Sequence, residues 1–204
     1  MQIKKILLLA CLAPALMLMS FAGRVIHTDV YLVDGKQSSL EWTGEKLTGK
    51  HTGTIAISKG QVMNNHGKIG GHFEFDMNTI TSTDLTGNGK EKIERHLKSE
   101  DFFDVSKYPK ATFIITSVTP IANAKSGEAT HQVNGSLTLK NKTNDISFPA
   151  TIKMDGNKLT CDGTAIVDRS KFDVRYASKS FFADIGDKAI YDEFALKFNV
   201  TALK

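Results

Sequence analysis

Strict alternation of apolar and polar residues is the feature that most constrains this chain. The pattern is clearest near the C-terminus, where Phe194, Leu196 and Phe198 alternate with Ala195 and Lys197. A period of two indicates a β-strand with one buried face. The same pattern recurs at residues 40–43, 52–57, 72–77, 133–139, 146–155 and 159–167. Strands of this kind must pack their apolar faces together, which predicts an all-β fold.

One short segment has helical spacing instead. Ile93 and Leu97 are four residues apart within residues 90–99, and Glu94 precedes Lys98 by four residues, an arrangement that supports a helix. The apolar face of this segment is too narrow for a central core element, so we expect a helix that caps one end of a sheet. Residues 79–89 are rich in Thr, Ser, Asn and Gly, which predicts a loop.

About eight strands are compatible with a two-sheet sandwich or with a closed barrel. A barrel of eight strands is filled by side chains or holds one small ligand, and the pattern leaves both possibilities open. Gly53, Gly135 and Gly163 fall on the apolar face of their strands, where they predict bends at barrel corners. Pro149 interrupts a good strand pattern and predicts an edge or a bend.

The N-terminus has the layout of a secretory signal peptide. Lys4 and Lys5 precede an apolar run over residues 6–19, and the small residues around Ala22 predict cleavage after it. We therefore expect a signal peptide at residues 1–22, one domain at residues 23–204, and a periplasmic or secreted protein. A retained anchor is one alternative, and a lipoprotein cleaved before Cys11 is another.

The charge balance gives no basis for nucleic-acid binding. Without residues 1–22 the chain keeps 24 basic and 22 acidic residues, a net charge of +2, whereas nucleic-acid binding requires a basic stripe. Cys161 is the only cysteine left after cleavage and is expected to be a buried thiol. The histidines lack zinc-ligand spacing, and the chain has no Gly-x-Ser-x-Gly motif. We expect neither a metal site nor catalytic residues.

A cluster of rings separates the helical segment from the later strands. Phe102, Phe103 and Tyr108 lie just before a strand expected at residues 110–118, and Pro109 favours an extended Tyr108. This arrangement predicts an aromatic plug between the helix and the sheet.

Several short motifs occur through the chain in a definite order and spacing. They are Leu40-Glu41-Trp42, His51-Thr52-Gly53, residues 97–105, Tyr108-Pro109-Lys110-Ala111-Thr112-Phe113, residues 133–143, Phe148-Pro149 and Asp168-Arg169-Ser170-Lys171-Phe172. Taken together, these motifs resemble those of the YceI-like family of periplasmic polyisoprenoid-binding proteins. The resemblance extends from about Tyr31 to Ala202, and Asp173 stands where the family usually has glycine.

The resemblance implies an extended, lipocalin-like antiparallel β-barrel that encloses an elongated apolar pore. Family members bind polyprenyl or quinone-type lipids and are not established enzymes, so the expected ligand is an isoprenoid lipid, with transient membrane contact and no other cofactor. His51 and Arg169 are candidates for contact with the lipid head group, although Arg169 is equally well explained by a structural ion pair. The predicted apolar pocket is lined by Ile55, Phe73, Phe75, Phe102, Phe103, Leu137, Phe148, Ile152, Phe194, Leu196 and Phe198.

Two alternatives remain open. The first is an enzyme that modifies a lipid or a quinone, with His51 as acid or base. The second is a stress-related structural barrel whose core is filled by side chains.

Overall fold

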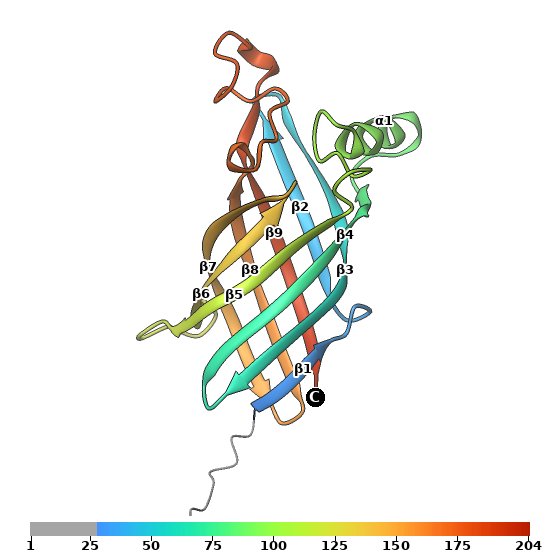
Figure 1. Ribbon diagram of the computed structural model, residues 1–204. Coiled ribbons are helices and arrows are strands. Elements are labelled where there is room, and N and C mark those ends of the chain that lie inside the picture. The colour runs from blue at the N-terminus through green and yellow to red at the C-terminus, as the bar shows by residue number, and fades with distance from the viewer. Residues whose placement is uncertain (1–27) are drawn as a thin grey trace, which may run out of the picture.

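A computed structural model describes residues 28–204 as one closed antiparallel β-barrel with a short helix at one end (Figure 1). The predicted signal peptide, its predicted cleavage site and Cys11 lie outside the described residues. The helix α1 spans Gly87–Lys98, and two 3₁₀ helices span Arg169–Phe172 and Gly186–Lys188. The strands are β1 Thr28–Val33, β2 Ser39–Lys46, β3 Gly49–Asn65, β4 Lys68–Ser82, β5 Lys110–Pro120, β6 His131–Leu139, β7 Lys142–Asp155, β8 Lys158–Asp168 and β9 Ile190–Leu203.

The barrel is an up-and-down meander. From β2 to β9 each strand pairs with the next one in sequence, and the pairing of β9 with β2 closes the ring. β1 and β2 share one position in this ring, because β2 pairs with the first part of β3 and β1 with its last part. Nine strand segments therefore make an eight-stranded barrel, which confirms the predicted fold class.

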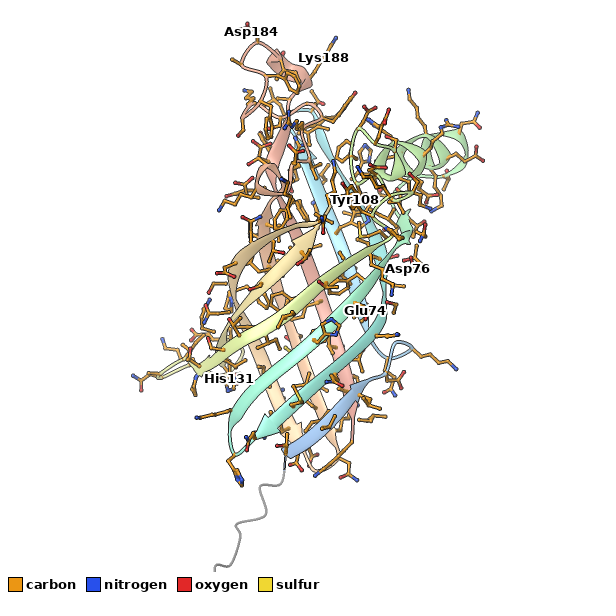
Figure 2. All side chains as sticks on the ribbon, in the orientation of Figure 1. Glu74, Asp76, Tyr108, His131, Asp184 and Lys188 are labelled. Carbon is orange, nitrogen blue, oxygen red and sulfur yellow. The ribbon has the colours of Figure 1, made fainter. Side chains whose placement is uncertain are left out.

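The two ends of the barrel differ. At the end where β1 crosses, the interior is packed, and Leu159 and Ala202 are almost fully buried. The other end carries α1 and the segment 173–189, whose tip is marked by Asp184 and Lys188 in Figure 2. Between the two ends, the rings of four phenylalanines follow one another through the interior, with neighbouring centroids 6.5, 5.6 and 5.3 Å apart: Phe73, Phe113, Phe148 and Phe198.

Two interior glycines make room for these rings. A Cβ at Gly135 would lie 2.3 Å from the ring of Phe113, and one at Gly163 would lie 2.8 Å from the ring of Phe198. Such distances are far below any normal contact, so the rings occupy the space that a side chain would need.

Other sequence predictions differ from the structure by a few residues. The segment predicted as a loop over residues 79–89 belongs to β4 as far as Ser82, because Thr81 and Ser82 pair with Thr54 and Gly53 of β3. The helix begins at Gly87, three residues earlier than predicted. Pro149 lies just before the point where β7 begins to pair with β8, at Ala150, so its missing N–H breaks no pairing there.

Candidate ligand-binding chamber

A chamber of about 730 Å³ lies at the end of the barrel that carries α1. This volume is within the range of small-molecule sites, roughly 300–1,000 Å³. Its walls come from β2, β3, β4, β9, α1, the aromatic segment after the helix and the segment 173–189. Its apolar lining includes Trp42, Ile55, Ile80, Leu85, Ile93, Leu97, Phe102, Phe103, Phe194 and Leu196, and its polar lining includes His51, Lys46, Lys92, His96 and Lys188.

A second, smaller cavity of about 100 Å³ lies within the barrel. Every residue that lines it is apolar or a cysteine, and the phenylalanine rings described above form much of its wall. Leu196 of β9 lines both spaces, so the cavity adjoins the inner side of the chamber. The interior thus offers a roomy outer compartment and a narrow, apolar inner one.

All eleven residues predicted to line an apolar pocket line one of these two spaces. Phe73, Phe75, Leu137, Phe148, Ile152 and Phe198 line the inner cavity. Ile55, Phe102, Phe103 and Phe194 line the chamber, and Leu196 lines both. Tyr108, the third ring of the predicted plug, lines neither space. Period-two alternation placed the strand residues on the inner face, whereas the expectation of a cavity came from the family resemblance.

His51 lies at the rim of the chamber, beside a carboxylate. Its Nδ1 is 2.8 Å from Oδ2 of Asp84, and Oδ1 of the same carboxyl accepts from the backbone N–H of Thr52 and from Ser82. Burial raises the pKa of Asp84, but these hydrogen bonds outweigh it and lower the pKa to about 2. Asp84 is therefore an acceptor at neutral pH, so Nδ1 of His51 donates to it.

The guanidinium of Arg169 is bound by other groups of the protein. Its guanidinium is buried and forms an ion pair with Asp192 at 3.3 Å. It also donates four hydrogen bonds of 2.7–3.1 Å to the backbone carbonyls of Val174, Tyr176, Ile190 and Tyr191. Arg169 lines neither the chamber nor the inner cavity. These contacts match the structural ion pair that was the alternative prediction for Arg169. Contact with a lipid head group would require breaking them.

The residue that departs from the family pattern, Asp173, lies at the end of the 3₁₀ helix. Its φ is 60° and its ψ is 33°, the left-handed conformation that glycine adopts most easily. Aspartate tolerates this region better than most residues, so Asp173 is compatible with the turn observed here.

Sequence reasoning missed several residues of the chamber. His96 packs edge-on against the rings of Phe102 and Tyr176, with centroids 5.1 and 4.3 Å away. Trp42 lines the chamber beside Leu196, its partner in the β2–β9 register. The alternation of Leu40 and Trp42 was a signal that could have placed Trp42 inside. Tyr176 lies in an irregular segment, which has no periodicity to reveal it.

Polar contacts hold α1 against the rim of the barrel. Oε1 of Glu94 is 2.6 Å from Nζ of Lys90, 2.5 Å from Oγ1 of Thr81 and 3.0 Å from the backbone N of Ser82. Lys90 also donates to the backbone carbonyl of Ser82. These contacts fix the helix to β4, which confirms its predicted position at one end of the sheet.

The thiol of Cys161 faces the inner cavity that it lines. Burial raises its pKa to about 12, so the unreactive thiol is the form present at neutral pH. Among residues 28–204, no group of three or more His, Cys, Asp or Glu side chains has the arrangement of a metal site. No helix in the same range has the length and apolar character needed to cross a membrane.

The chain matches a known protein family over most of its length. Residues 31–202 match the family model described as the YceI-like domain. The chain belongs to the YceI-like family. A UPF0312 protein of Pseudomonas putida is 38% identical over 77 residues, a match that covers 38% of this chain and 37% of that protein. A UPF0312 protein of Pseudomonas fluorescens is 27% identical over 167 residues, or 74% and 79% of the two chains.

Solved structures share the fold of this YceI-like chain. The crystal structure of BcnA from Burkholderia cenocepacia matches with a TM-score of 0.62 at 24% identity, over 83% of this chain and 99% of that one. A polyisoprenoid-binding domain from Saccharophagus degradans matches with a TM-score of 0.57 at 11% identity, over 85% and 97%. At these identities the likeness establishes the barrel architecture.

Proposed function

We propose that this protein binds an isoprenoid-type lipid, polyprenyl or quinone-like, in the barrel interior for transport or storage. The observation that carries the proposal is the chamber of about 730 Å³, which adjoins a wholly apolar cavity in a YceI-like barrel. Membership of that family and the likeness to a polyisoprenoid-binding domain support it.

Size favours the chamber as the main compartment for the ligand. Burial of apolar surface contributes roughly 25 cal/mol per Å², less the costs of association. The inner cavity, at about 100 Å³, is smaller than usual ligand sites of roughly 300–1,000 Å³. We infer that the lipid fills the chamber first, and that the tail enters the inner cavity only as rings such as Phe148 and Phe198 move aside.

We propose that this activity lies outside the cytoplasm, in the periplasm or in secreted form, and the signal-peptide pattern at the N-terminus supports this location. We also propose transient contact with a membrane through the chamber end of the barrel. Leu47, Phe181 and Phe182 lie in the two segments at this end, residues 46–49 and 173–189, and are 66%, 39% and 50% exposed.

Native mass spectrometry and lipid extraction of protein from its own host test the proposal, which predicts a co-purifying isoprenoid lipid. Gly44→Phe is the blocking variant, because Gly44 lines the chamber and a Cβ there meets nothing within 4 Å. Thr43→Phe, one residue away in the alternating strand, is the matched control for a ring on the opposite face. Repeated absence of lipid from the wild-type protein would overturn the proposal.

One observation favours each alternative. The ordered His51–Asp84 pair supports a lipid- or quinone-modifying enzyme; loss of turnover in His51→Ala with binding retained would establish it. The small inner cavity supports a structural barrel with a filled core, but a filled core does not account for the larger chamber. We therefore favour binding without catalysis.

A further inference from the structure

The indole N–H of Trp42 is a buried hydrogen-bond donor that has no acceptor among residues 28–204. The side chain is only 7% exposed. An indole nitrogen can donate but cannot accept, and buried donors in native proteins nearly always have a partner. A donor left unpaired in the interior is costly, so its retention here calls for a partner that the protein does not supply.

Trp42 lies between the backbone of the barrel wall and the chamber, and a ligand can approach its ring from the chamber. One side of the ring packs on the backbone of β3, where a Cβ at Gly53 would lie 2.5 Å from Cζ2 and 2.6 Å from Cε2, the atom bonded to the indole nitrogen. Trp42 also lines the chamber. Its register partner Leu196 lines both spaces, and Leu40, two residues earlier on β2, lines the inner cavity. Trp42 thus stands where the chamber meets the inner cavity.

We propose that the indole N–H of Trp42 donates a hydrogen bond to an oxygen atom of the bound lipid. This inference rests on the proposed function and narrows it: the ligand is an oxygenated lipid, not a pure hydrocarbon. A prenol hydroxyl and a quinone carbonyl both supply the required acceptor. The oxygen then lies at the inner side of the chamber, and the apolar chain extends away from it through the chamber.

Trp42→Phe tests the inference because it removes the donor and keeps an aromatic ring. The probes are a short prenol, a short-chain benzoquinone and the hydrocarbon with the carbon skeleton of the prenol. A neutral hydrogen bond corresponds to a change of about 2- to 10-fold in affinity. We expect the variant to lose about this factor for the prenol, the quinone or both, and to bind the hydrocarbon as the wild type does.

The wild-type protein offers a direct second readout. Trp42 is the only tryptophan in the chain, so a ¹⁵N-labelled sample gives one indole N–H signal that needs no assignment. This signal should shift downfield with the oxygenated probes and much less with the hydrocarbon. The probe that gives the larger shift identifies the hydroxyl or the carbonyl as the better acceptor.

The outcomes separate this inference from the proposed function. Equal weakening of all three probes by Trp42→Phe, or an indole signal that does not move when an oxygenated probe binds, would overturn the hydrogen bond and leave lipid binding intact. If none of the three probes binds the wild-type protein, the proposed function fails and the inference fails with it.

Discussion

Arg169 joins three parts of the chain at the chamber end: its own 3₁₀ helix, the segment that follows, and the start of β9. We expect Arg169→Met to destabilise the fold by about 3–5 kcal/mol, because it removes one partner of a buried ion pair and leaves Asp192 without its cation. Urea unfolding of the variant and the wild type measures this difference.

Arg175→Gln is the matched control for Arg169. Arg175 also forms an ion pair with an aspartate, but its side chain is 61% exposed. Exposed pairs contribute about 0–1 kcal/mol, so this variant should unfold close to the wild type. Similar losses in the two variants would contradict the structural role assigned to Arg169.

At the level of single residues, sequence patterns predicted where side chains lie but not what they contact. Alternation placed Phe73 and Phe148 inside correctly. It could not show that Gly53 is small because Thr81 and Trp42 both crowd it, since a Cβ there would lie 1.8 Å from the carbonyl oxygen of Thr81. It also left open which role Arg169 has, because its acceptors are backbone carbonyls in irregular segments.

Among the elements, α1 depends on a carboxylate that protonates in acid. The hydrogen bonds that Glu94 accepts from Lys90, Thr81 and Ser82 lower its pKa from 4.5 to about 2. A lowered pKa contributes stability that is present above about pH 4.5 and is lost as the pH falls towards 2. The melting temperature of the wild type should therefore exceed that of Glu94→Gln above pH 5, and the gap should shrink towards pH 2.

Glu91→Gln is the control on the same helix, because Glu91 is exposed and makes none of these contacts. Its melting temperature should follow that of the wild type throughout the titration. If the difference in melting temperature between wild type and Glu94→Gln stays constant from pH 5 to pH 2, the attachment of α1 to β4 does not depend on the charge of Glu94.

The aromatic segment after α1 should act as a wall of the chamber. Phe103 is half-buried and lines it, whereas Phe102 is also part of the core at 7% exposure. Phe103→Ala should release bound lipid faster with little change in the free energy of unfolding. Phe102→Ala should cost about 3–5 kcal/mol. Lipid dissociation kinetics and urea unfolding of both variants would separate the two roles. Unchanged lipid release in Phe103→Ala would contradict the role of Phe103 as a wall of the chamber.

Elements were easier to predict than their boundaries. Period two identified the strands and period 3.6 the helix, because both patterns follow from which face is buried. The end of β4 was missed because Thr81 and Ser82 are strand residues only through their pairing with β3. Nothing in the local sequence shows that β1 and β2 share one place in the ring, since this depends on the length of β3.

For the whole molecule, the two ends of the barrel should differ in their contact with membranes. We expect the double variant Phe181→Ser/Phe182→Ser to transfer bound lipid to vesicles more slowly, with unchanged affinity for the lipid. Ile166→Ser is the control, because Ile166 is 56% exposed on β8 in the barrel wall. Transfer rates measured with vesicles of defined composition test this prediction. Equal slowing by Ile166→Ser would contradict membrane contact through the chamber end.

The closure of the ring by β9 has a consequence for the order of events in the cell. The barrel depends on the pairing of β9 with β2, and β9 also supplies Phe194 and Leu196 to the chamber wall. Synthesis runs from the N-terminus, so the strand that completes the wall is made last. A complete chamber therefore exists only once the whole chain has been made, and we expect the proposed lipid to enter through the barrel end after β9 has closed the ring.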